Sequence, residues 1–286
     1  MADEQAVGPA TADEVAYFAR RRTANEHDAR LYVDLAHVAP NGVFVARDEG
    51  TAIGIAMPHA LEDEWFLSDL YVEPSFRGHG LGLELLTAAA DDAGAVTRSG
   101  VLDPAHLEGL AFYSRLAVPL QMPLLEIAGE VPRASELEKM AAGEHRFGAV
   151  PIDPMAHAAA LNQLDREVRG AARPADHLYL ADNAKGFVFT REAEIAGYAY
   201  VWPSGRIGPM ASVSHNYSVQ MLAYTLAVLR ASYNAEWCTL LVPGINAKVL
   251  RATMKARLRI TGTKVFASDN IISDLTRYIG GSSLMF

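Results

Sequence analysis

The chain has 286 residues, a length typical of two domains, and half of them are apolar, so a substantial core can be buried. The 25 basic and 34 acidic residues give a net charge of −9, which argues against a surface that binds nucleic acid. Cys238 is the single cysteine, which excludes an internal disulfide and a multi-cysteine zinc site. The acidic start of the chain lacks the apolar core of a signal peptide, and no apolar run is long enough to span a bilayer, so we expect a cytoplasmic protein.

The first part of the sequence predicts a short strand, two helices and three further strands. The short strand covers Gln5–Gly8, and a capping box, Thr11-Ala12-Asp13-Glu14, then starts a helix that ends near Arg20. A second helix is expected over Asn25–His37. The three strands are expected at Val43–Arg47, at Ala52–Met57 and, after a connection from Pro58 to Asp63, at Glu64–Val72.

A glycine-rich loop follows the last of these strands. Gly78, Gly80 and Gly82 remove every second side chain, so the backbone can adopt positive φ and approach a ligand closely. A helix is predicted from Leu81 onward, and its first N–H groups and the positive end of its dipole would point at the loop. Arg77 and neighbouring His79 add positive charge at the same place. The loop therefore predicts a cradle for a phosphate or pyrophosphate, although a simple turn from strand to helix is the alternative.

The rest of the first half predicts a strand over Ala95–Leu102, a helix starting at Asp103-Pro104 and a last strand over Val118–Ile127. Residues 131–146 are expected to be a linker with a capping box at Ser135-Glu136-Leu137-Glu138. The pattern then repeats. Strands are expected at Ala149–Ile152, Phe187–Thr190, Ile195–Val201, Arg206–Met210, Thr239–Val242 and near Thr263–Ala267. Helices are expected from Asp153-Pro154, at Ser218–Leu229 and at Ala247–Ala256. We infer an internal duplication.

The motif Arg77-x-x-Gly80-x-Gly82 comes directly after a strand that ends in Val72-Glu73-Pro74. The alternating glycines do not fit the dinucleotide fingerprint, and the loop has no lysine for a P-loop. The motif resembles the acyl-CoA loop of the GNAT superfamily of N-acetyltransferases. The resemblance implies an α/β fold with a mixed sheet, two such folds in tandem, and acetyl-CoA as co-substrate. It also implies an N-terminal GNAT domain over residues 1–130 that binds acetyl-CoA, and a C-terminal GNAT-like domain over residues 147–286.

The second half lacks the acyl-CoA loop, because Pro209-Met210-Ala211-Ser212-Val213 stands where the arginine and glycines would be. It therefore resembles the degenerate partner domain of tandem acetyltransferases. We expect it to line the acceptor cleft or to stabilise the fold. Asp165 and Arg173 are expected to form a structural ion pair, in preference to a substrate contact.

In the GNAT superfamily the central strand separates from its neighbour, and its backbone near Leu70 and Val72 pairs with the pantetheine arm. The implied cofactor site consists of Leu70, Tyr71, Val72, Arg77, Gly78, His79, Gly80, Leu81, Gly82, His106 and Tyr113. The resemblance makes Tyr113 the general acid for the leaving thiolate. The family pattern Asn-x-x-Ala-x-x-x-Tyr is here His106-x-x-Gly109-x-x-x-Tyr113, which keeps the tyrosine and leaves the role of His106 open. An aromatic core pair of Phe112 and Tyr113 is the alternative.

The general base is not defined by a family residue, because the matching positions, Phe66 and Ser68, carry no base. Glu64 is the candidate, acting directly or through a water molecule held by Ser68, and a solvated carboxylate without a role is the alternative. Side chains alternate along a strand, so Glu64, Phe66 and Ser68 should share one face and Asp69 the other. His59 and ordered water are further candidates.

The resemblance implies an N-acetyltransferase that acts on the primary amine of a small molecule. A protein lysine or N-terminal acetyltransferase and a non-catalytic acyl-CoA-binding module are the alternatives. No histidine pair has the spacing of a zinc helix motif, so we expect no metal, and we expect neither nucleic acid nor a membrane as partner.

Overall fold

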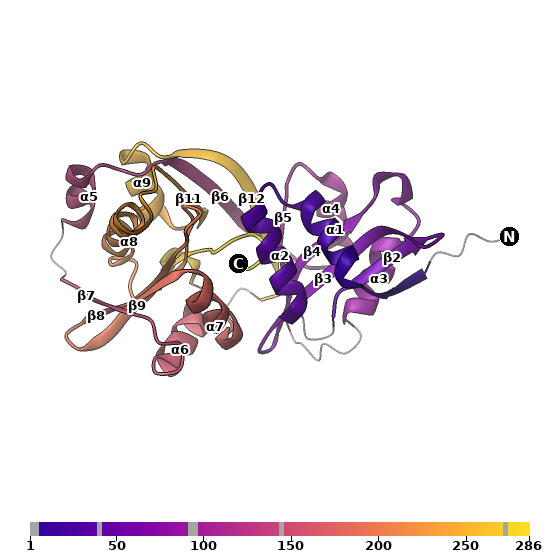
Figure 1. Ribbon diagram of the computed structural model, residues 1–286, viewed down its shortest axis with the longest axis horizontal. Helices are drawn as coiled ribbons and strands as arrows, with labels where there is room; N and C mark the ends of the chain where they lie inside the picture. Colours follow the sequence, from indigo (N-terminus) through magenta and orange to yellow (C-terminus); the bar gives the residue numbers. More distant parts are fainter. Residues whose placement is uncertain (1–5, 39–41, 91–96, 143–145, 271–273) are drawn as a thin grey trace. The chain divides into compact units, whose positions relative to one another are not determined.

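The computed structural model describes residues 6–38, 42–90, 97–142, 146–270 and 274–286. The chain folds into two compact units, Met1–Gly100 and Val101–Phe286, which are described in turn (Figure 1). The expectations for Gln5 and for residues 95 and 96 lie outside the described residues.

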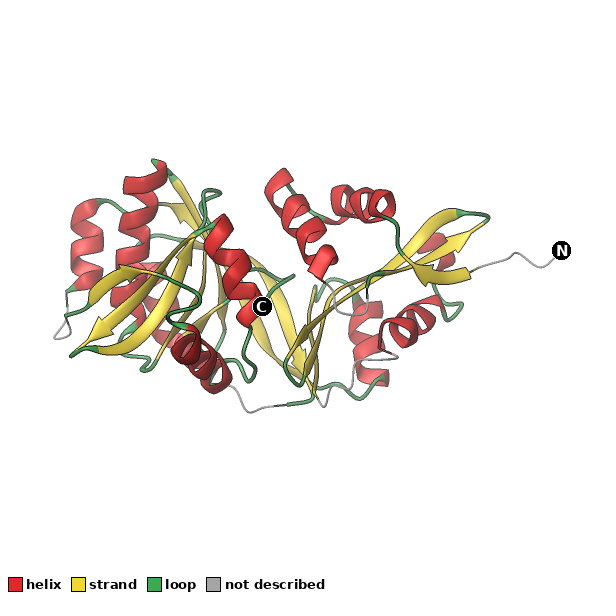
Figure 2. Ribbon diagram, turned by 60° about the horizontal axis from the view of Figure 1, so that its bottom comes forward, coloured by secondary structure: helices red, strands yellow, loops and turns green. Residues whose placement is uncertain are grey.

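The first unit is a mixed sheet with helices on both faces. Its strands are hydrogen-bonded in the order β1-β2-β3-β4-β5 and are antiparallel except for the β4–β5 pair. They cover Ala6–Pro9 (β1), Phe44–Asp48 (β2), Thr51–Leu61 (β3), Glu64–Val72 (β4) and Thr97–Leu102 (β5). Helices α1 (Ala12–Arg22) and α2 (Glu26–Val38) lie on one face, and α3 (Leu81–Ala90) lies on the other (Figure 2).

The capping box at the start of α1 is confirmed. The Thr11 hydroxyl accepts from the Glu14 N–H at 3.3 Å, and the Glu14 carboxylate accepts from the Thr11 N–H at 2.7 Å. The same carboxylate forms an ion pair with Arg47 of β2 at 2.7 Å, which ties the start of α1 to the sheet. Val15, Phe18 and Ala19 recur at helical spacing and are buried, so α1 packs on the sheet through one apolar face.

A β-bulge interrupts β4 at Ser68. Met57 of β3 pairs with Asp69 while Pro58 pairs with Leu67, so Ser68 is an extra residue on β4. Pro58 was expected to begin a connection, and this was wrong: β3 continues to Leu61, because the proline falls at the bulge, where it interrupts no regular ladder.

The bulge also changes which face Asp69 occupies. Trp65 points toward α3, where its indole N–H donates to the Ala89 carbonyl at 3.4 Å, whereas Asp69 binds Arg22 of α1 and Tyr32 of α2. Strict alternation would put Trp65 and Asp69 on one face. The expectation that Asp69 lies opposite to Glu64 and Phe66 was therefore wrong, because the extra residue reverses the alternation.

The second unit contains a five-stranded sheet in the order β13-β10-β9-β8-β7, and strands β12, β6 and β11 that pair in that order. Its helices are α4 (Leu107–Arg115), α5 (Ala134–Ala141), α6 (Ala158–Val168), α7 (Pro174–Asn183), α8 (Ser218–Tyr233) and α9 (Ala247–Lys255). Its strands are β6 (Leu120–Glu130), β7 (Gly148–Pro151), β8 (Lys185–Arg191), β9 (Glu194–Val201), β10 (Ile207–Ser212), β11 (Trp237–Pro243), β12 (Arg259–Ser268) and β13 (Tyr278–Ile279).

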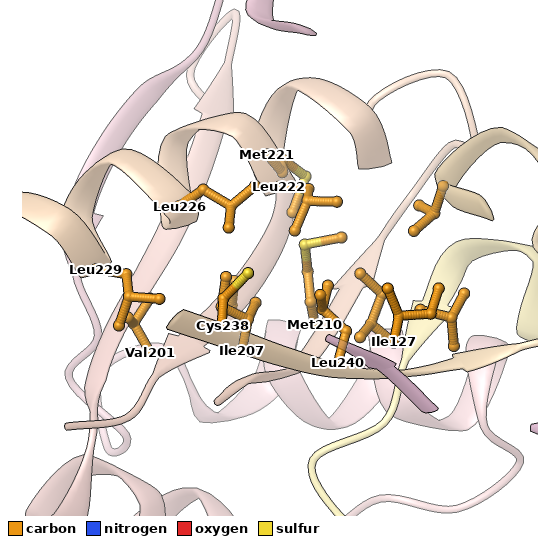
Figure 3. Close-up of a cluster of buried hydrophobic side chains, with 14 of the residues drawn as sticks. Ile127, Val201, Ile207, Met210, Met221, Leu222, Leu226, Leu229, Cys238 and Leu240 are labelled. Carbon is orange, nitrogen blue, oxygen red and sulfur yellow. The ribbon is translucent and has the colours of Figure 1, made fainter. Parts of the chain in front are cut away.

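The main core of the second unit lies under α8 (Figure 3). Met221, Leu222 and Leu226 of this helix pack on Met210 of β10 and Leu240 of β11. Because α8 covers one face of the five-stranded sheet, the opposite face is left for α6 and α7, which cover the buried Tyr198 and Tyr200 of β9. Burial on both faces accounts for the continuous apolar runs in β9 and β10.

The order of elements repeats along the chain. The series β1-α1-α2-β2-β3-β4-α3-β5-α4-β6 is matched by β7-α6-α7-β8-β9-β10-α8-β11-α9-β12, which confirms the duplication. The compact units nevertheless meet at residue 100 and not at 130, because β6 pairs with β11 and β12. The domain boundaries at 130 and 147 describe the repeat and stay a prediction.

Three local expectations differ from the structure. The Asp103 carboxylate accepts from the Ala105 N–H in a turn, and α4 begins only at Leu107. Asp153 likewise forms a turn, and α6 begins at Ala158. The expected linker contains α5, where Glu136 and not Glu138 reaches back to accept the Arg133 N–H at 3.1 Å. Helix α7 was not expected from the sequence.

Candidate active site

The end of β4 has an open edge. The parallel pairing of β4 with β5 stops at Leu67 and Gly100, and among the described residues no strand of the first unit pairs with this edge from Ser68 to Val72. The Glu73 N–H donates to the Ile53 carbonyl of β3 at 2.8 Å, so the backbone groups of Leu70 and Val72 face the open edge by alternation. The edge offers N–H and C=O groups to an extended ligand.

The glycine loop presents a row of backbone donors next to this edge. Gly78 and Gly80 have positive φ values of 84° and 93°. Within the part of the chain that the structure describes, no backbone acceptor engages the N–H groups from Gly78 to Gly82, whereas the following N–H groups of Leu83 and Glu84 bind the Gly80 carbonyl. Alternating φ signs turn successive N–H groups toward one side and form an anion-binding nest at the start of α3.

The two cations of the loop have different surroundings. The Arg77 guanidinium donates through Nε to the Val72 carbonyl at 2.9 Å and lies over the Tyr71 ring, 5.8 Å from its centre. These contacts hold the start of the loop against the end of β4. His79 is exposed, with Nδ1 3.4 Å from the Phe76 carbonyl. A phosphate on the nest would therefore lie beside two basic side chains.

A polar cluster covers the α1 side of the same edge. The Arg22 guanidinium donates from Nε and Nη2 to the two carboxylate oxygens of Asp69, each at 3.0 Å, and stacks 4.5 Å from the centre of the Tyr71 ring. Tyr32 donates to Asp69 at 2.9 Å. Burial would lower the pKa of Arg22, but the Asp69 carboxylate raises it above its usual value. Burial and the same carboxylate raise the pKa of Tyr32 well above its usual value, so its proton stays on the phenol.

A second ion pair lies beside the first. Arg21 donates to the Glu73 carboxylate at 2.7 Å, and the Tyr71 hydroxyl donates to the same carboxylate at 2.9 Å. Sequence reasoning did not select Arg21, Arg22 or Tyr32. The run Arg20-Arg21-Arg22 was visible, but a basic helix end is equally expected from the helix dipole.

The candidate base residues lie away from the loop. Glu64 begins β4, about 25 Å along the strand from Val72, and is buried, with the Ser99 hydroxyl donating to its carboxylate. Ser68, at the bulge, is buried about 13 Å along the strand from Glu64. That separation exceeds the reach of one bridging water, so the strand offers no direct relay between them. His59 is buried on β3, where it pairs with Phe66.

Tyr113 and His106 lie on α4 in the second unit. Tyr113 is buried, and its ring packs edge to face against the Phe112 ring, with 6.3 Å between the ring centres. The aromatic pair considered as an alternative is therefore present, which does not conflict with a role for the Tyr113 hydroxyl. His106 is exposed at the N-cap position of α4 and makes no side-chain capping bond.

The corresponding gap in the second half is filled by its own chain. Among the described residues, strand β11 approaches β10 at an isolated bridge between Thr239 and Arg206, the residue before β10. Beyond it, β13 pairs with β10, and the Gly280 N–H donates to the Leu241 carbonyl of β11 at 2.8 Å. Arg277 donates to the Val213 carbonyl at 2.9 Å in the loop that follows β10. Segment 277–280 thus occupies the edge that is open in the first half.

A buried ionic cluster joins α6, α7 and β9. The Arg173 guanidinium and the Asp165 carboxylate are both fully buried and lie 3.2 Å apart, so the expected ion pair is present. His177 approaches Asp165 at 2.8 Å and Tyr200 at 2.9 Å, and the Tyr198 hydroxyl donates to Asp165. Burial alone would raise the pKa of Asp165, but Arg173 and His177 hold it well below its usual value. Because all five side chains are buried, we interpret the cluster as structural and not as a substrate site.

A cavity of about 680 Å³ lies between α5 and α8 in the second unit, and alanines form much of its lining. Its lining includes Glu138 and Tyr224 but neither the glycine loop nor the end of β4, so we take the open edge of β4 as the candidate active site. Among the described residues, no group of histidine, cysteine and carboxylate side chains could hold a metal ion. Their helices include none with the length and hydropathy of a membrane span.

Comparison with known proteins gives a family match for part of the chain. The model of the acetyltransferase (GNAT) family matches residues 11–117. A candidate acetyltransferase from Pyrococcus horikoshii superimposes with a TM-score of 0.75 at 14% identity, covering 99% of this chain and 96% of that one. A comparison with curated protein sequences gives no match.

Two further solved structures are similar in fold. A GCN5-related N-acetyltransferase from Sphaerobacter thermophilus gives a TM-score of 0.65 at 15% identity, over 94% of this chain and 96% of that one. A tandem GNAT protein from the clavulanic acid biosynthesis pathway gives a TM-score of 0.61 at 18% identity, over 93% of this chain and 98% of that one. Identities this low show the shared fold alone, which is two GNAT folds in tandem.

Proposed function

Because residues 11–117 match the model of the acetyltransferase (GNAT) family, we propose that the chain transfers an acetyl group from acetyl-CoA to the primary amine of a small molecule in the cytoplasm. The family establishes an acyltransferase that uses acyl-CoA, and the kind of acceptor is our proposal. One observation carries the use of acetyl-CoA: the N–H groups from Gly78 to Gly82, which bind no backbone acceptor among the described residues, adjoin the open edge of β4. The nest suits the diphosphate of coenzyme A, and the edge suits its extended pantetheine arm.

Acetyl transfer by direct attack requires a neutral amine beside the thioester. The amine nitrogen bonds to the carbonyl carbon, the carbon–sulfur bond breaks, the nitrogen loses a proton and the thiolate gains one. A backbone N–H at Leu70 or Val72 would stabilise the oxyanion that forms on the carbonyl. Tyr113 is our proposed acid for the thiolate. Since Glu64 is remote from Val72 along β4, we propose ordered water as the base and keep Glu64 and Ser68 for the fold.

The cradle is tested by two matched glycine substitutions. Gly78 (φ 84°) and Gly50 (φ 80°), the latter in the β2–β3 turn, have no atom within 4 Å of an added Cβ. Alanine at either position therefore has a similar strain of roughly 1–2 kcal/mol. We expect Gly78→Ala to weaken coenzyme A binding at least about tenfold by calorimetry, because the Cβ would enter the nest, and Gly50→Ala to leave the affinity unchanged. Equal affinities for both variants would contradict the cradle.

The alternative functions give different results in a thiol-release assay. Turnover with free amines supports the small-molecule acceptor. Turnover only with peptides would favour a protein lysine or N-terminal acetyltransferase. Binding of acetyl-CoA without turnover on amines or peptides would favour a non-catalytic acyl-CoA-binding module.

A further inference from the structure

We infer that the acceptor carries a carboxylate as well as its amine, as an α-amino acid does, and that Arg22 and Arg21 bind this carboxylate. The inference rests on the proposed function and adds the chemical class of the acceptor. It arises from the polar cluster of Arg21, Arg22, Asp69, Tyr71 and Glu73 on the α1 side of the open edge.

The two sides of the open edge differ in polarity. On the α3 side, Val72 and Leu85 both lie close to Gly54. A Cβ added to Gly54 would be 3.4 Å from the Val72 side chain and 3.1 Å from the Leu85 side chain. Apolar side chains therefore pack closely at that point. On the α1 side, Asp69, Tyr71 and Glu73 project with the two arginines. A charged acceptor would therefore approach an acyl group on this edge from the α1 side.

The two arginines retain donors beyond their ion pairs. Arg22 uses Nε and Nη2 for Asp69, and the described residues provide no hydrogen-bond partner for its Nη1. Arg21 uses Nη2 for Glu73 and also interacts with the Tyr71 hydroxyl. The Arg22 side chain is 31% exposed and that of Arg21 is 48% exposed, so both guanidinium groups reach solvent. Asp69 is only 9% exposed, and it orients the Arg22 fork.

This geometry suits a carboxylate better than an amine alone. A guanidinium held on one side by a carboxylate presents its remaining N–H groups in a fixed plane, which matches the planar oxygens of a second carboxylate. Tyr32 holds the Asp69 carboxylate, and the Tyr71 ring lies against Arg22, so little side-chain freedom is lost on binding. An acceptor anchored in this way keeps its amine close to the backbone of β4.

The test compares acceptors in pairs that differ only in the carboxylate. Each amino acid is assayed beside the amine that remains when its carboxylate is removed: glycine with methylamine, phenylalanine with phenethylamine. We expect kcat/KM to favour the amino acids by about 10- to 100-fold, the range of one or two hydrogen bonds to a charged group. In Arg22→Gln we expect this preference to fall below about threefold, through a higher KM with kcat largely retained. Comparing the same pair in both proteins cancels the intrinsic difference between the two amines.

Arg30→Gln is the matched control. Arg30 lies on α2 in an exposed pair with Asp34, at 3.7 Å and with 74% of its side chain exposed, so this variant should keep the preference. Arg21→Gln is a second variant with little risk to folding, and it should reduce the preference in part. Turnover of amines without a carboxylate preference in the wild type, or a preference that persists in both Arg22→Gln and Arg21→Gln, would overturn the inference while leaving the proposed function intact. If no amine or amino acid is acetylated although coenzyme A binds, the proposed function fails and the inference fails with it.

Discussion

Replacing Asp165 by asparagine tests what the buried ionic cluster does for the fold. The substitution keeps the shape of the side chain and removes its charge. Arg173 then loses the carboxylate that it contacts at a site where both side chains are fully buried, and Asp176 still attracts it. Breaking a buried ion pair on one side destabilises a protein by about 3–5 kcal/mol, because the remaining charge stays desolvated. We take the lower end, about 3 kcal/mol, because asparagine still accepts a hydrogen bond.

Hydrogen exchange of the α6, α7 and β9 amides measures this loss locally. A loss of about 3 kcal/mol raises the open population, and with it the exchange rate, by roughly 100-fold. Glu192→Gln is the control, since Glu192 is 80% exposed in its pair with Arg191 and should change exchange by a few-fold at most. The double variant Asp165→Asn/Arg173→Met should recover much of the protection, because it also removes the buried cation. Wild-type exchange in the single variant, or no recovery in the double variant, would refute the reasoning.

The same residue predicts how stability changes with pH. The pKa of Asp165 is held below its usual value near 3.8, so the unfolded chain takes up this proton first as the pH falls. The stabilising contribution is complete above about pH 4 and is lost as the pH falls through the folded-state pKa. The difference in unfolding free energy between wild type and Asp165→Asn should therefore be constant from pH 8 to 5 and shrink in stronger acid.

Three further outcomes are expected. Tyr113→Phe should lower kcat by about 100-fold with unchanged calorimetric affinity for coenzyme A, and an unchanged kcat would remove Tyr113 as the acid. Burial raises the pKa of the Cys238 thiol from 9.0 to about 12, so its contribution to stability is intact below pH 9 and is lost between pH 9 and 12. Between pH 8 and pH 11, the unfolding free energy measured in urea should therefore fall less for Cys238→Ala than for wild type. Thr11→Ala removes the N-cap of α1 and should lower the unfolding free energy by about 1 kcal/mol, measured by urea denaturation.

The glycine loop and the strand before it were predictable because the decisive information is local. Positive φ at Gly78 and Gly80 needs glycine, and β4 begins and ends at the residues expected from its pattern. The bulge at Ser68 was not predictable, since it depends on how β3 and β4 pair and not on the identity of one residue. It nevertheless decides that Asp69 faces α1, and strand alternation alone gave the opposite answer.

Contacts between residues far apart in the sequence could not be predicted either. Arg22 meets Asp69 from a different helix, and nothing in the run Arg20–Arg22 indicates which arginine finds a partner. Segment 277–280 has no sequence signature, because the two-residue strand β13 carries no periodic pattern. Asp165 and Arg173 were recognised as a pair, whereas His177 joined them only through α7, which the sequence did not predict.

Segment 277–280 has a consequence for stoichiometry. Two folds of one type would ordinarily offer two slots for the same extended cofactor, but in the second fold β13 and Gly280 already lie between β10 and β11. The chain itself supplies there the hydrogen bonds that an incoming pantetheine arm would need. We therefore expect a titration with coenzyme A to saturate at one molecule per chain.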